Sequence, residues 1–235
     1  MAASLTVLVG RWQSRKRART GERRVSERSE GSVEPAIVHV VDDDGSLRDA
    51  LDSLFRSVGL ETRTYGSARA FLDAARPDAA GCLVLDIRLP GLSGLDFQAQ
   101  LAEQGIGLPV ILMTGHGDIP MTVRGMKAGA VDFLTKPFRD QDMLDAVAVA
   151  IERDRSRRET AREDADLAAR YATLSARERQ VMTLVTAGRM NKQVAGDLEL
   201  SEITVKIHRG SAMRKMGART LPDLVRMAEA LGLGA

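Results

Sequence analysis

Apolar residues follow two different spacings along most of this chain, and each spacing predicts a different element. Short continuous apolar runs, bounded by glycine, proline or acidic residues, predict strands that are buried on both faces. Between these runs, apolar residues recur every three or four positions, as in a helix with one buried side. The predicted strands are residues 37–41, 60–65, 82–86, 109–114 and 130–135, and the predicted helices are 47–58, 67–75, 94–103, 119–128 and 140–153. Because strand and helix alternate throughout, we expect an α/β fold with a doubly wound, five-stranded parallel sheet.

Residues 173–235 show only the helical spacing, which predicts a small all-α domain. Ser175 and Glu178 have the spacing of a capping box at a helix start, and Gly217 is placed to end a later helix. The predicted helices are residues 175–188, 191–198, 201–216 and 221–231.

The second and third of these helices are joined by a tight turn, and the third is rich in basic residues. This pattern indicates a helix-turn-helix whose second helix enters the major groove of DNA. An ordinary helical bundle with exposed basic residues would show the same pattern, so the residues alone leave both interpretations open.

Two segments lack the apolar pattern. Residues 1–35 are rich in arginine, serine and glutamate, which predicts a disordered basic extension. Residues 154–172 carry charges of both signs with few large apolar residues. They predict an exposed helical linker that extends the preceding helix and has no binding role. The expected division is therefore extension 1–35, α/β domain 36–153, linker 154–172 and helical domain 173–235.

Polar side chains follow four of the five predicted strands at the point where each strand ends. Asp42 and Asp43 end the first strand, and Asp86 ends the third. Thr114 ends the fourth and Lys136 follows the fifth. In open α/β sheets these strand ends meet at one edge, where ligands bind. Packed carboxylates repel one another, and a hard cation such as Mg²⁺ relieves that cost. Thr114 and Lys136 would bind phosphoryl oxygens, so the pattern predicts phosphoryl transfer onto Asp86 as nucleophile.

Each of these residues also has a purely local interpretation. Asp43 or Asp44 could cap the following helix, and Asp86 could simply start a turn. Thr114 could lie in a turn, and Lys136 could pair with Asp132. Their joint position at one edge favours the shared site.

Composition and charge narrow the class of protein. Hydrophobic residues make up 44% of the chain and aromatic residues only 3%, so the cores must be mostly aliphatic. The single cysteine, Cys82, lies in an apolar run, which predicts a buried, inert thiol and excludes a disulfide framework. No apolar stretch approaches the ~20 residues of a membrane span, so we expect a cytoplasmic protein without a membrane partner. Residues 36–150 carry ten basic and sixteen acidic side chains, against ten and six in residues 173–235, which favours an anionic polymer as partner of the C-terminal part.

Four stretches of residues 36–155 carry a family resemblance: VVDDDGSLR, LVLDIRLPGLSG, VILMTGHGDIPM and GAVDFLTKPF. They resemble a two-component response-regulator receiver domain of the FixJ/NarL class, with a flavodoxin-like fold. The resemblance implies that Asp86 accepts phosphate from a sensor histidine kinase. It also implies that Asp43, Asp86 and the backbone carbonyl of Arg88 hold Mg²⁺, with Asp42 acting through water. Lys136 would contact the phosphate.

The same resemblance implies a switch pair and two flanking positions. The Thr114 hydroxyl would move to the phosphate, and the Phe133 ring would turn inward behind it. Many relatives have tyrosine at the second position, so the inward state here depends on packing alone. Arg88 and His116 hold positions that tune phosphate lifetime in the family, and Lys136–Pro137 matches the family's cis peptide bond.

The C-terminal part carries a second resemblance in LSARERQV, NKQVAGDLELSEITVKIHRGSAMRKMG and LPDLVRMA. It is similar to the LuxR-type DNA-binding domain, over residues 172–235. The resemblance implies that Lys206 and Ile207, with Arg209, face base edges. Residues expected to contact phosphates or to pack are Thr204, Asn191, Lys192, His208 and Arg214. Ile203 and Gly210 replace polar or basic residues of many relatives, so the set of base contacts stays open.

Together these features predict a response-regulator transcription factor rather than an enzyme. Phosphorylation of Asp86 would control dimerisation and sequence-specific DNA binding. The expected cofactor is Mg²⁺, and the expected partners are a sensor histidine kinase, double-stranded DNA, a second copy of the chain and, as a further candidate, RNA polymerase. One rival is a phosphatase with an aspartyl-phosphate intermediate, which would need an acid two residues beyond the nucleophile, where Arg88 stands. The other is a constitutive DNA binder whose receiver signals through protein contacts only.

Overall fold

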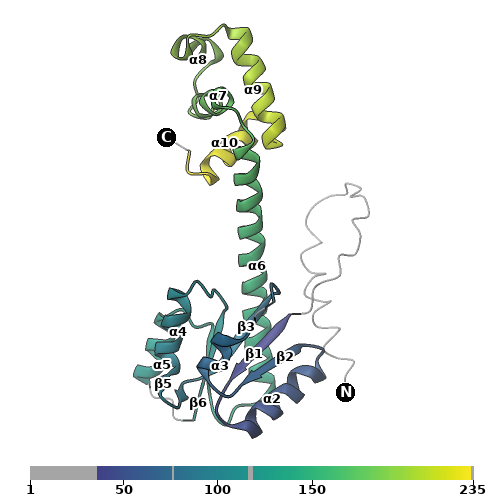
Figure 1. Ribbon diagram of the computed structural model, residues 1–235, viewed down its shortest axis with the longest axis vertical. Helices are drawn as coiled ribbons and strands as arrows, with labels where there is room; N and C mark the ends of the chain where they lie inside the picture. The colour runs from purple at the N-terminus through teal and green to yellow at the C-terminus, as the bar shows by residue number, and fades with distance from the viewer. Residues whose placement is uncertain (1–35, 76, 116–118, 234–235) are drawn as a thin grey trace. The chain divides into compact units, whose positions relative to one another are not determined.

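The computed structural model describes residues 36–75, 77–115 and 119–233 (Figure 1). The expected disordered extension 1–35 and His116 lie outside these residues. Within the described part of the chain, no helix is both long enough and apolar enough to cross a membrane.

The first half of the described chain is a five-stranded parallel sheet, as the alternating pattern predicts. The strand order is β2-β1-β3-β6-β7, and every neighbouring pair is parallel. The strands are β1 (Ile37–Val41), β2 (Glu61–Tyr65), β3 (Gly81–Asp86), β6 (Val110–Thr114) and β7 (Asp132–Thr135). The helices that connect them are α2 (Gly45–Ser57), α3 (Ala68–Asp73), α4 (Gly94–Glu103) and α5 (Ile119–Lys127), and α6 (Asp140–Ala172) follows the last strand. The doubly wound α/β fold is therefore confirmed.

Two apolar cores cover the two faces of the sheet, because side chains alternate across each strand. One face packs against α2 and α6, with Phe55 and Met143 fully buried. The other packs against α3, α4 and α5, with Phe71 and Phe97 fully buried and in edge-to-face contact. Burial, together with the nearby charge of Asp154, raises the pKa of the Cys82 thiol to about 12. The predicted burial of this thiol is thus confirmed, and its raised pKa disfavours the reactive thiolate.

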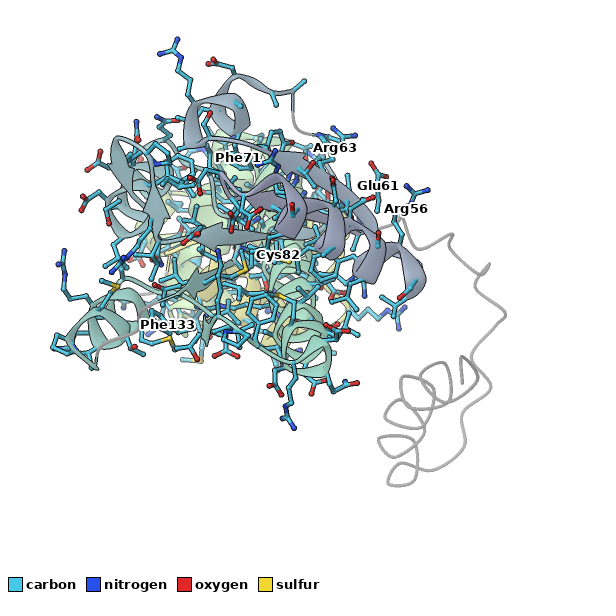
Figure 2. All side chains as sticks on the ribbon, turned by 90° about the horizontal axis from the view of Figure 1, so that it is seen from below. Arg56, Glu61, Arg63, Phe71, Cys82 and Phe133 are labelled. Carbon is cyan, nitrogen blue, oxygen red and sulfur yellow. The ribbon has the colours of Figure 1, made fainter. Side chains whose placement is uncertain are left out.

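Figure 2 shows how side chains divide between the interior and the outer edge of this sheet. Phe71 and Cys82 point into the interior, whereas Arg56, Glu61 and Arg63 lie at the outside beside the edge strand β2. An Arg63–Glu61 ion pair at 3.3 Å covers this edge with charge. Charged side chains on an edge strand discourage pairing with another chain.

The structure adds one small sheet that the apolar pattern does not reveal. Strands β4 (Arg88–Leu89) and β5 (Leu92–Ser93) pair antiparallel directly after β3. Gly91 lies between them with a φ of +79°, which glycine adopts without strain. Two-residue strands are too short for a period to be detected, so sequence patterning misses them.

Helix α6 runs without a break through the segment expected to be a linker. The prediction of a fully solvated charged face is wrong at Asp154, which is completely buried. Its Oδ2 accepts hydrogen bonds from the Gly81 backbone N–H at 3.1 Å and from Arg158 at 2.8 Å, and its Oδ1 accepts from Arg157 at 2.7 Å. A buried charge must be paired, and these contacts join α6 to the start of β3.

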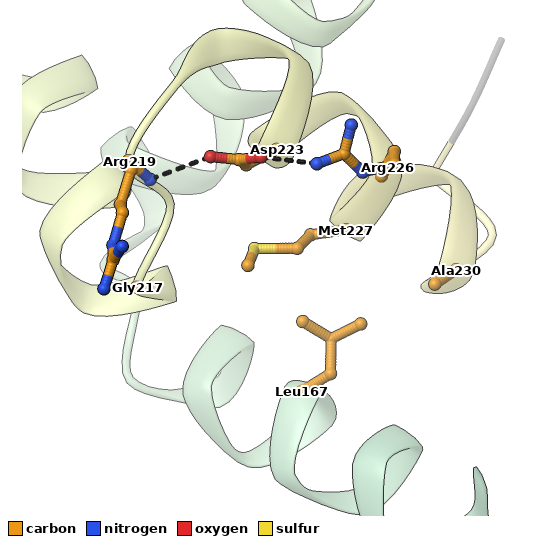
Figure 3. A pocket seen from close by; sticks show the side chains of 7 residues that line it. All are labelled: Leu167, Gly217, Arg219, Asp223, Arg226, Met227 and Ala230. Carbon is orange, nitrogen blue, oxygen red and sulfur yellow. Dashed lines mark hydrogen bonds and ion pairs between the residues drawn. The ribbon is translucent and has the colours of Figure 1, made fainter. Parts of the chain in front are cut away.

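The C-terminal part is helical throughout, with helices α7 (Ala176–Thr186), α8 (Asn191–Leu198), α9 (Glu202–Met216) and α10 (Leu221–Ala230) around one apolar core. Leu167 and Tyr171, at the end of α6, pack against this core. Leu167 faces Met227 of α10 across an open hollow of about 300 Å³, beside which Asp223 is hydrogen-bonded to Arg219 and Arg226 (Figure 3).

Local sequence signals set the ends of these helices. Ser175 and Glu178 form the predicted capping box at the start of α7. Ser201 caps α9, which ends at Gly217 with a φ of +77°, also as predicted. Glu199 ends α8 with a φ of 56°, in the left-handed region that non-glycine residues rarely adopt. Sequence patterning gives no sign of that strained turn.

Candidate functional site

Three carboxylates meet at the carboxyl edge of the sheet. Asp42 and Asp43 follow β1, and Asp86 ends β3, which lies beside β1. One carboxylate oxygen from each of the three lies within 4.8 Å of the others. Asp42 is completely buried and Asp86 is 6% exposed, whereas Asp43 is exposed. The sheet thus brings together the acidic residues that strand ends alone identify.

Backbone and side-chain donors hold the two buried carboxylates in place. Asp86 Oδ1 accepts a hydrogen bond from the Arg88 backbone N–H at 2.9 Å, and Asp42 Oδ1 accepts one from the Asp44 N–H at 2.9 Å. The Arg48 guanidinium donates to the backbone carbonyl of Asp42 at 2.6 Å. Asp44 caps α2 by accepting from two backbone N–H groups, so its local interpretation is correct and it serves outside the cluster.

Lys136 lies between the two buried carboxylates. Its Nζ donates to Asp42 Oδ2 at 2.7 Å and to Asp86 Oδ2 at 2.6 Å. The chain carries it there from the end of β7, where its backbone N–H donates to the Thr114 carbonyl at 2.7 Å. The following Lys136–Pro137 bond is cis, as the resemblance implies. The pairing with Asp132 that the sequence left open is not what the structure shows, because Asp132 accepts from the Phe133 N–H at 2.7 Å.

The pKa shifts in this cluster reflect burial opposed by charge pairing. Burial raises the pKa of Asp42, the neighbouring Asp86 charge adds to that rise, and Lys136 only partly offsets it. Burial alone would lower the pKa of Lys136, but its hydrogen bonds with Asp42 and Asp86 outweigh that effect and raise it. Lys136 thus pairs with two of the three clustered carboxylates, Asp42 and Asp86, so the cluster carries more negative than positive charge.

This donor set fits a hard divalent cation. Mg²⁺ prefers carboxylate, carbonyl and water oxygens and is often held by one or two carboxylates. Exposed Asp43 and buried Asp86 offer carboxylate oxygens close to each other, and the β4–β5 hairpin begins at Arg88, two residues after Asp86. Asp42 is tied to Lys136 and to the Asp44 N–H, which leaves it less free to bind an ion directly. The excess negative charge is the observation that speaks for a cation.

Replacing Asp42 with asparagine is expected to stabilise the protein when Mg²⁺ is absent. The change removes a buried carboxylate whose pKa is raised. The single amide oxygen can still accept from Lys136, and the hydrogen bond from the N–H of exposed Asp44 is given up in exchange. We expect a gain of about 1 kcal/mol in the free energy of unfolding, equivalent to about 2–4 °C in Tm. Thermal unfolding in EDTA measures this. Adding Mg²⁺ should stabilise the natural protein more than the variant, and a lower Tm for the variant in EDTA would contradict the account.

The two predicted switch residues lie on neighbouring strands, Thr114 at the carboxyl end of β6 and Phe133 two residues before the end of β7. Thr114, at the end of β6, is completely buried, and Phe133 in β7 is half-buried. Gly125 of α5 allows this helix to lie close to the sheet, because a Cβ there would come within 2.5 Å of a Leu112 methyl group. The same Cβ would lie 3.9 Å from the Phe133 ring, so this ring packs beside α5 at ordinary contact distance.

A glycine that the sequence pattern did not single out positions the acceptor loop. Gly94 begins α4, and its N–H donates to the Ile87 carbonyl at 2.8 Å. A Cβ at this position would lie 2.5 Å from the Asp86 carbonyl oxygen. Only glycine allows α4 to begin against the backbone that carries Asp86. Gly94 is the last residue of the LPGLSG stretch that carries the family resemblance. The reason that it must be glycine is its contact with the Asp86 backbone, which the sequence does not show.

The predicted DNA-contacting residues lie on α8 and α9. Lys206 and Ile207 are exposed on α9, and Lys192 is exposed on α8. Arg209 is half-buried, and its guanidinium donates to Asn191 Oδ1 at 3.3 Å, which ties α9 to α8. The other predicted contacts are half-buried or exposed on the same helix: Thr204, His208 and Arg214.

Glu178 links the start of α7 to the end of α9, a role that its capping-box signature does not reveal. It is 5% exposed, and its oxygens accept from Ser211 at 2.6 Å and from Lys215 at 2.7 Å besides the Ser175 N–H. Lys215, Ser211 and Ser175 together lower the pKa of Glu178 to about 2.

Replacing Glu178 with glutamine is expected to lower the free energy of unfolding of the C-terminal part by about 2 kcal/mol at pH 7. Because the folded pKa of about 2 lies below the ordinary value of 4.5, the stabilisation is complete above pH 4.5. It is lost as pH falls from 4.5 toward 2. Hydrogen exchange of the Val181 and Val205 amides at pH 7 and pH 3 measures it. Exposed Glu229, changed to glutamine, is the control, and equal exchange in both variants would contradict the prediction.

Comparison with known proteins adds two family matches. The response regulator receiver domain model matches residues 38–148, and that of bacterial regulatory proteins of the luxR family matches residues 172–228. Nodulation protein W of Bradyrhizobium diazoefficiens is 62% identical over 200 residues, which cover 85% of this chain and 88% of that protein. The response regulator protein TodT of Pseudomonas putida is 45% identical over 212 residues, covering 90% and 91%. Among solved structures, the response regulator StyR has a TM-score of 0.76 at 46% identity and covers 83% of this chain and 98% of its own.

Proposed function

The chain belongs to the two-component response regulators that join a receiver domain to a LuxR-type DNA-binding domain, and on that premise we propose that phosphorylation of Asp86 by a sensor histidine kinase controls its dimerisation and its binding to DNA. The observation that carries the proposal is the position of Asp86 among two further carboxylates and Lys136 at one edge of the sheet.

The proposed reaction moves a phosphoryl group from a phosphohistidine of the kinase to Asp86. A carboxylate oxygen of Asp86 forms the new O–P bond while the N–P bond to the histidine breaks, and the histidine nitrogen takes up the leaving electron pair. Asp86 is kept ready for this by the Arg88 N–H, which orients one oxygen. Lys136 leaves its contact with Asp86 and neutralises the transferred phosphoryl oxygens.

We assign Mg²⁺ to Asp43, Asp86 and the backbone carbonyl of Arg88, with Asp42 acting through water. When bound, the ion supplies positive charge against the carboxylates and the incoming phosphoryl oxygens. Support comes from the excess of negative charge around a single ammonium group.

Phosphorylation then acts on the predicted switch pair. The Thr114 hydroxyl turns toward the new phosphoryl oxygen, and the Phe133 ring moves into the space that it leaves. Thr114 follows Met113, which pairs with Asp86, and Phe133 lies on the adjacent strand β7, where it pairs with Leu112. The change favours a receiver surface that binds a second copy.

Dimerisation would bring two DNA-binding domains onto one two-fold site. Joining two modules raises apparent affinity through effective concentration, without new contacts. We assign base contacts to Lys206, Ile207 and Arg209. Phosphate contacts, which position the domain without reading sequence, are assigned to Thr204, His208, Asn191, Lys192 and Arg214. Such a regulator acts in the cytoplasm, and RNA polymerase is a further candidate partner.

Treatment of the full chain with acetyl phosphate and Mg²⁺ tests the proposal. We expect an aspartyl phosphate by intact mass, a shift from monomer to dimer by light scattering, and increased retention of DNA, all from the same sample. A chain that remains unlabelled by acetyl phosphate and by phosphorylated histidine kinase would contradict it. Labelling without a change in oligomeric state or in DNA retention would contradict the proposed control.

A further inference from the structure

The outward side of α9 is apolar over its first two turns. Ile203 is 71% exposed and Ile207 is 64% exposed, and Ile203 has the highest exposure among the large hydrophobic residues in the described part of the chain. They are four residues apart, so their side chains are neighbours on one helix face. Single exposed apolar residues need no explanation, but two adjacent β-branched side chains on one exposed helix face do.

This face points away from the core of the C-terminal domain. The buried residues of α9 are Val205, Ala212 and Met216. At 100° per residue, Ile203 and Ile207 lie on the opposite side of the helix from these three residues. Neither isoleucine therefore contributes to the core that holds the domain together.

Gly210 continues the same face one turn later. A Cβ there would meet only the flexible end of Arg214 at 3.8 Å, so packing within the chain does not demand glycine. Glycine in a helix interior is destabilising relative to alanine. Because Gly210 has no side chain, the backbone of α9 beside the two isoleucines is open to close approach by a partner.

Cationic side chains border this apolar surface. Lys206 lies between the two isoleucines in sequence and is exposed, and Arg214 follows on the same side of α9. Acidic groups flank only the start of the helix, at Glu199 and Glu202. An apolar strip beside cations complements the DNA major groove, whose edges carry phosphates and whose only apolar group is the thymine 5-methyl.

We propose that Ile203 and Ile207 recognise thymine 5-methyl groups in the major groove, with Gly210 allowing α9 to approach the bases. This inference rests on the proposed DNA-binding function and deepens it, because it names the base feature that α9 reads. The isoleucines would be specificity-determining residues, and phosphate contacts would supply most of the affinity.

The test uses the full chain treated with acetyl phosphate and Mg²⁺ and a pool of random DNA duplexes. The most enriched duplex is resynthesised with each thymine replaced in turn by uracil, which removes only the methyl group. At one or more positions we expect about fourfold weaker binding per methyl, the equivalent of ~0.8 kcal/mol for one buried CH₂ group. Ile203→Ala and Ile207→Ala should bind the thymine duplex more weakly than the natural protein does. Each variant should also bind thymine and uracil duplexes equally at the position that its missing side chain would contact.

Val149→Ala is the matched control, because Val149 is also a β-branched residue, 60% exposed, on a different helix. It should keep the full thymine-to-uracil ratio. Equal binding of thymine and uracil duplexes by the natural protein would overturn the inference and leave the proposed function standing. A uracil effect of unchanged size in both isoleucine variants would also overturn it, since DNA shape would then be the cause. Enrichment of no duplex at all would overturn the proposed function together with the inference.

Discussion

Asp86→Asn is expected to abolish aspartyl-phosphate formation, lowering labelling by acetyl phosphate at least about 100-fold. The amide has nearly the shape of the carboxylate but lacks the nucleophilic oxygen. It also removes one charge from the cluster that holds Lys136 at 2.6 Å. The variant should therefore fold, remain a monomer when treated with acetyl phosphate and Mg²⁺, and show no increase in DNA retention. Intact mass, light scattering and DNA retention measure the three effects.

Asp44→Asn is the matched control for this experiment. It makes the same chemical change two residues after Asp42, at an exposed helix cap where asparagine serves as well as aspartate. Labelling, dimerisation and DNA retention should remain at the level of the natural protein. Residual labelling of the Asp86 variant at the natural rate would show that another side chain accepts the phosphoryl group. An equal loss in both variants would show that general charge, rather than a nucleophile, is responsible.

Asp154→Ala is expected to lower the free energy of unfolding of the receiver domain by about 3 kcal/mol. The carboxylate is completely buried and accepts from the Gly81 N–H, Arg157 and Arg158. Its removal leaves a buried N–H without its partner. Arg158, which pairs with both Asp154 and Asp78, keeps only its contact with Asp78. Calorimetry on the full chain measures the unfolding of the receiver domain.

Asp164→Ala controls for the loss of an acidic residue from the same helix, because Asp164 is exposed. It should change the free energy of unfolding by less than about 0.5 kcal/mol. Faster hydrogen exchange of the Gly81 amide in the Asp154 variant alone would identify the broken contact directly. Equal free energies of unfolding of the two variants would mean that water replaces the buried carboxylate at no cost, which would contradict the stabilising role of the Asp154 contacts.

Several features of the site follow from sequence because they depend only on local order along the chain. Apolar runs and helical spacing identify strands and helices, and the carboxyl ends of parallel strands must meet at one edge. That rule places Asp42, Asp43, Asp86, Thr114 and Lys136 together without coordinates. The caps Ser175, Ser201 and Gly217 are equally local, since each acts on backbone groups within a few residues.

Other features depend on distances between segments that are remote in sequence. Lys136 could have paired with Asp132, but the sheet carries it to Asp42 and Asp86, which are 94 and 50 residues away. Asp154 resembled a solvated charge within a charged segment, yet 73 residues separate it from the Gly81 N–H that it accepts from. Burial of a charge depends on which segments surround it, and a one-dimensional pattern does not contain that.

The sequence by itself thus determined the alternation of elements, the helix caps at Ser175, Ser201 and Gly217, and the set of residues at the reactive edge, because each follows from periodicity or from nearest neighbours. Only the tertiary structure decided how that set is paired, why Gly94 must be glycine, and that Ile203 and Ile207 face away from the core. The physical reason is that packing and electrostatics act through space: a Cβ at residue 94 would lie 2.5 Å from the Asp86 carbonyl oxygen, a contact between elements that no spacing along the chain encodes.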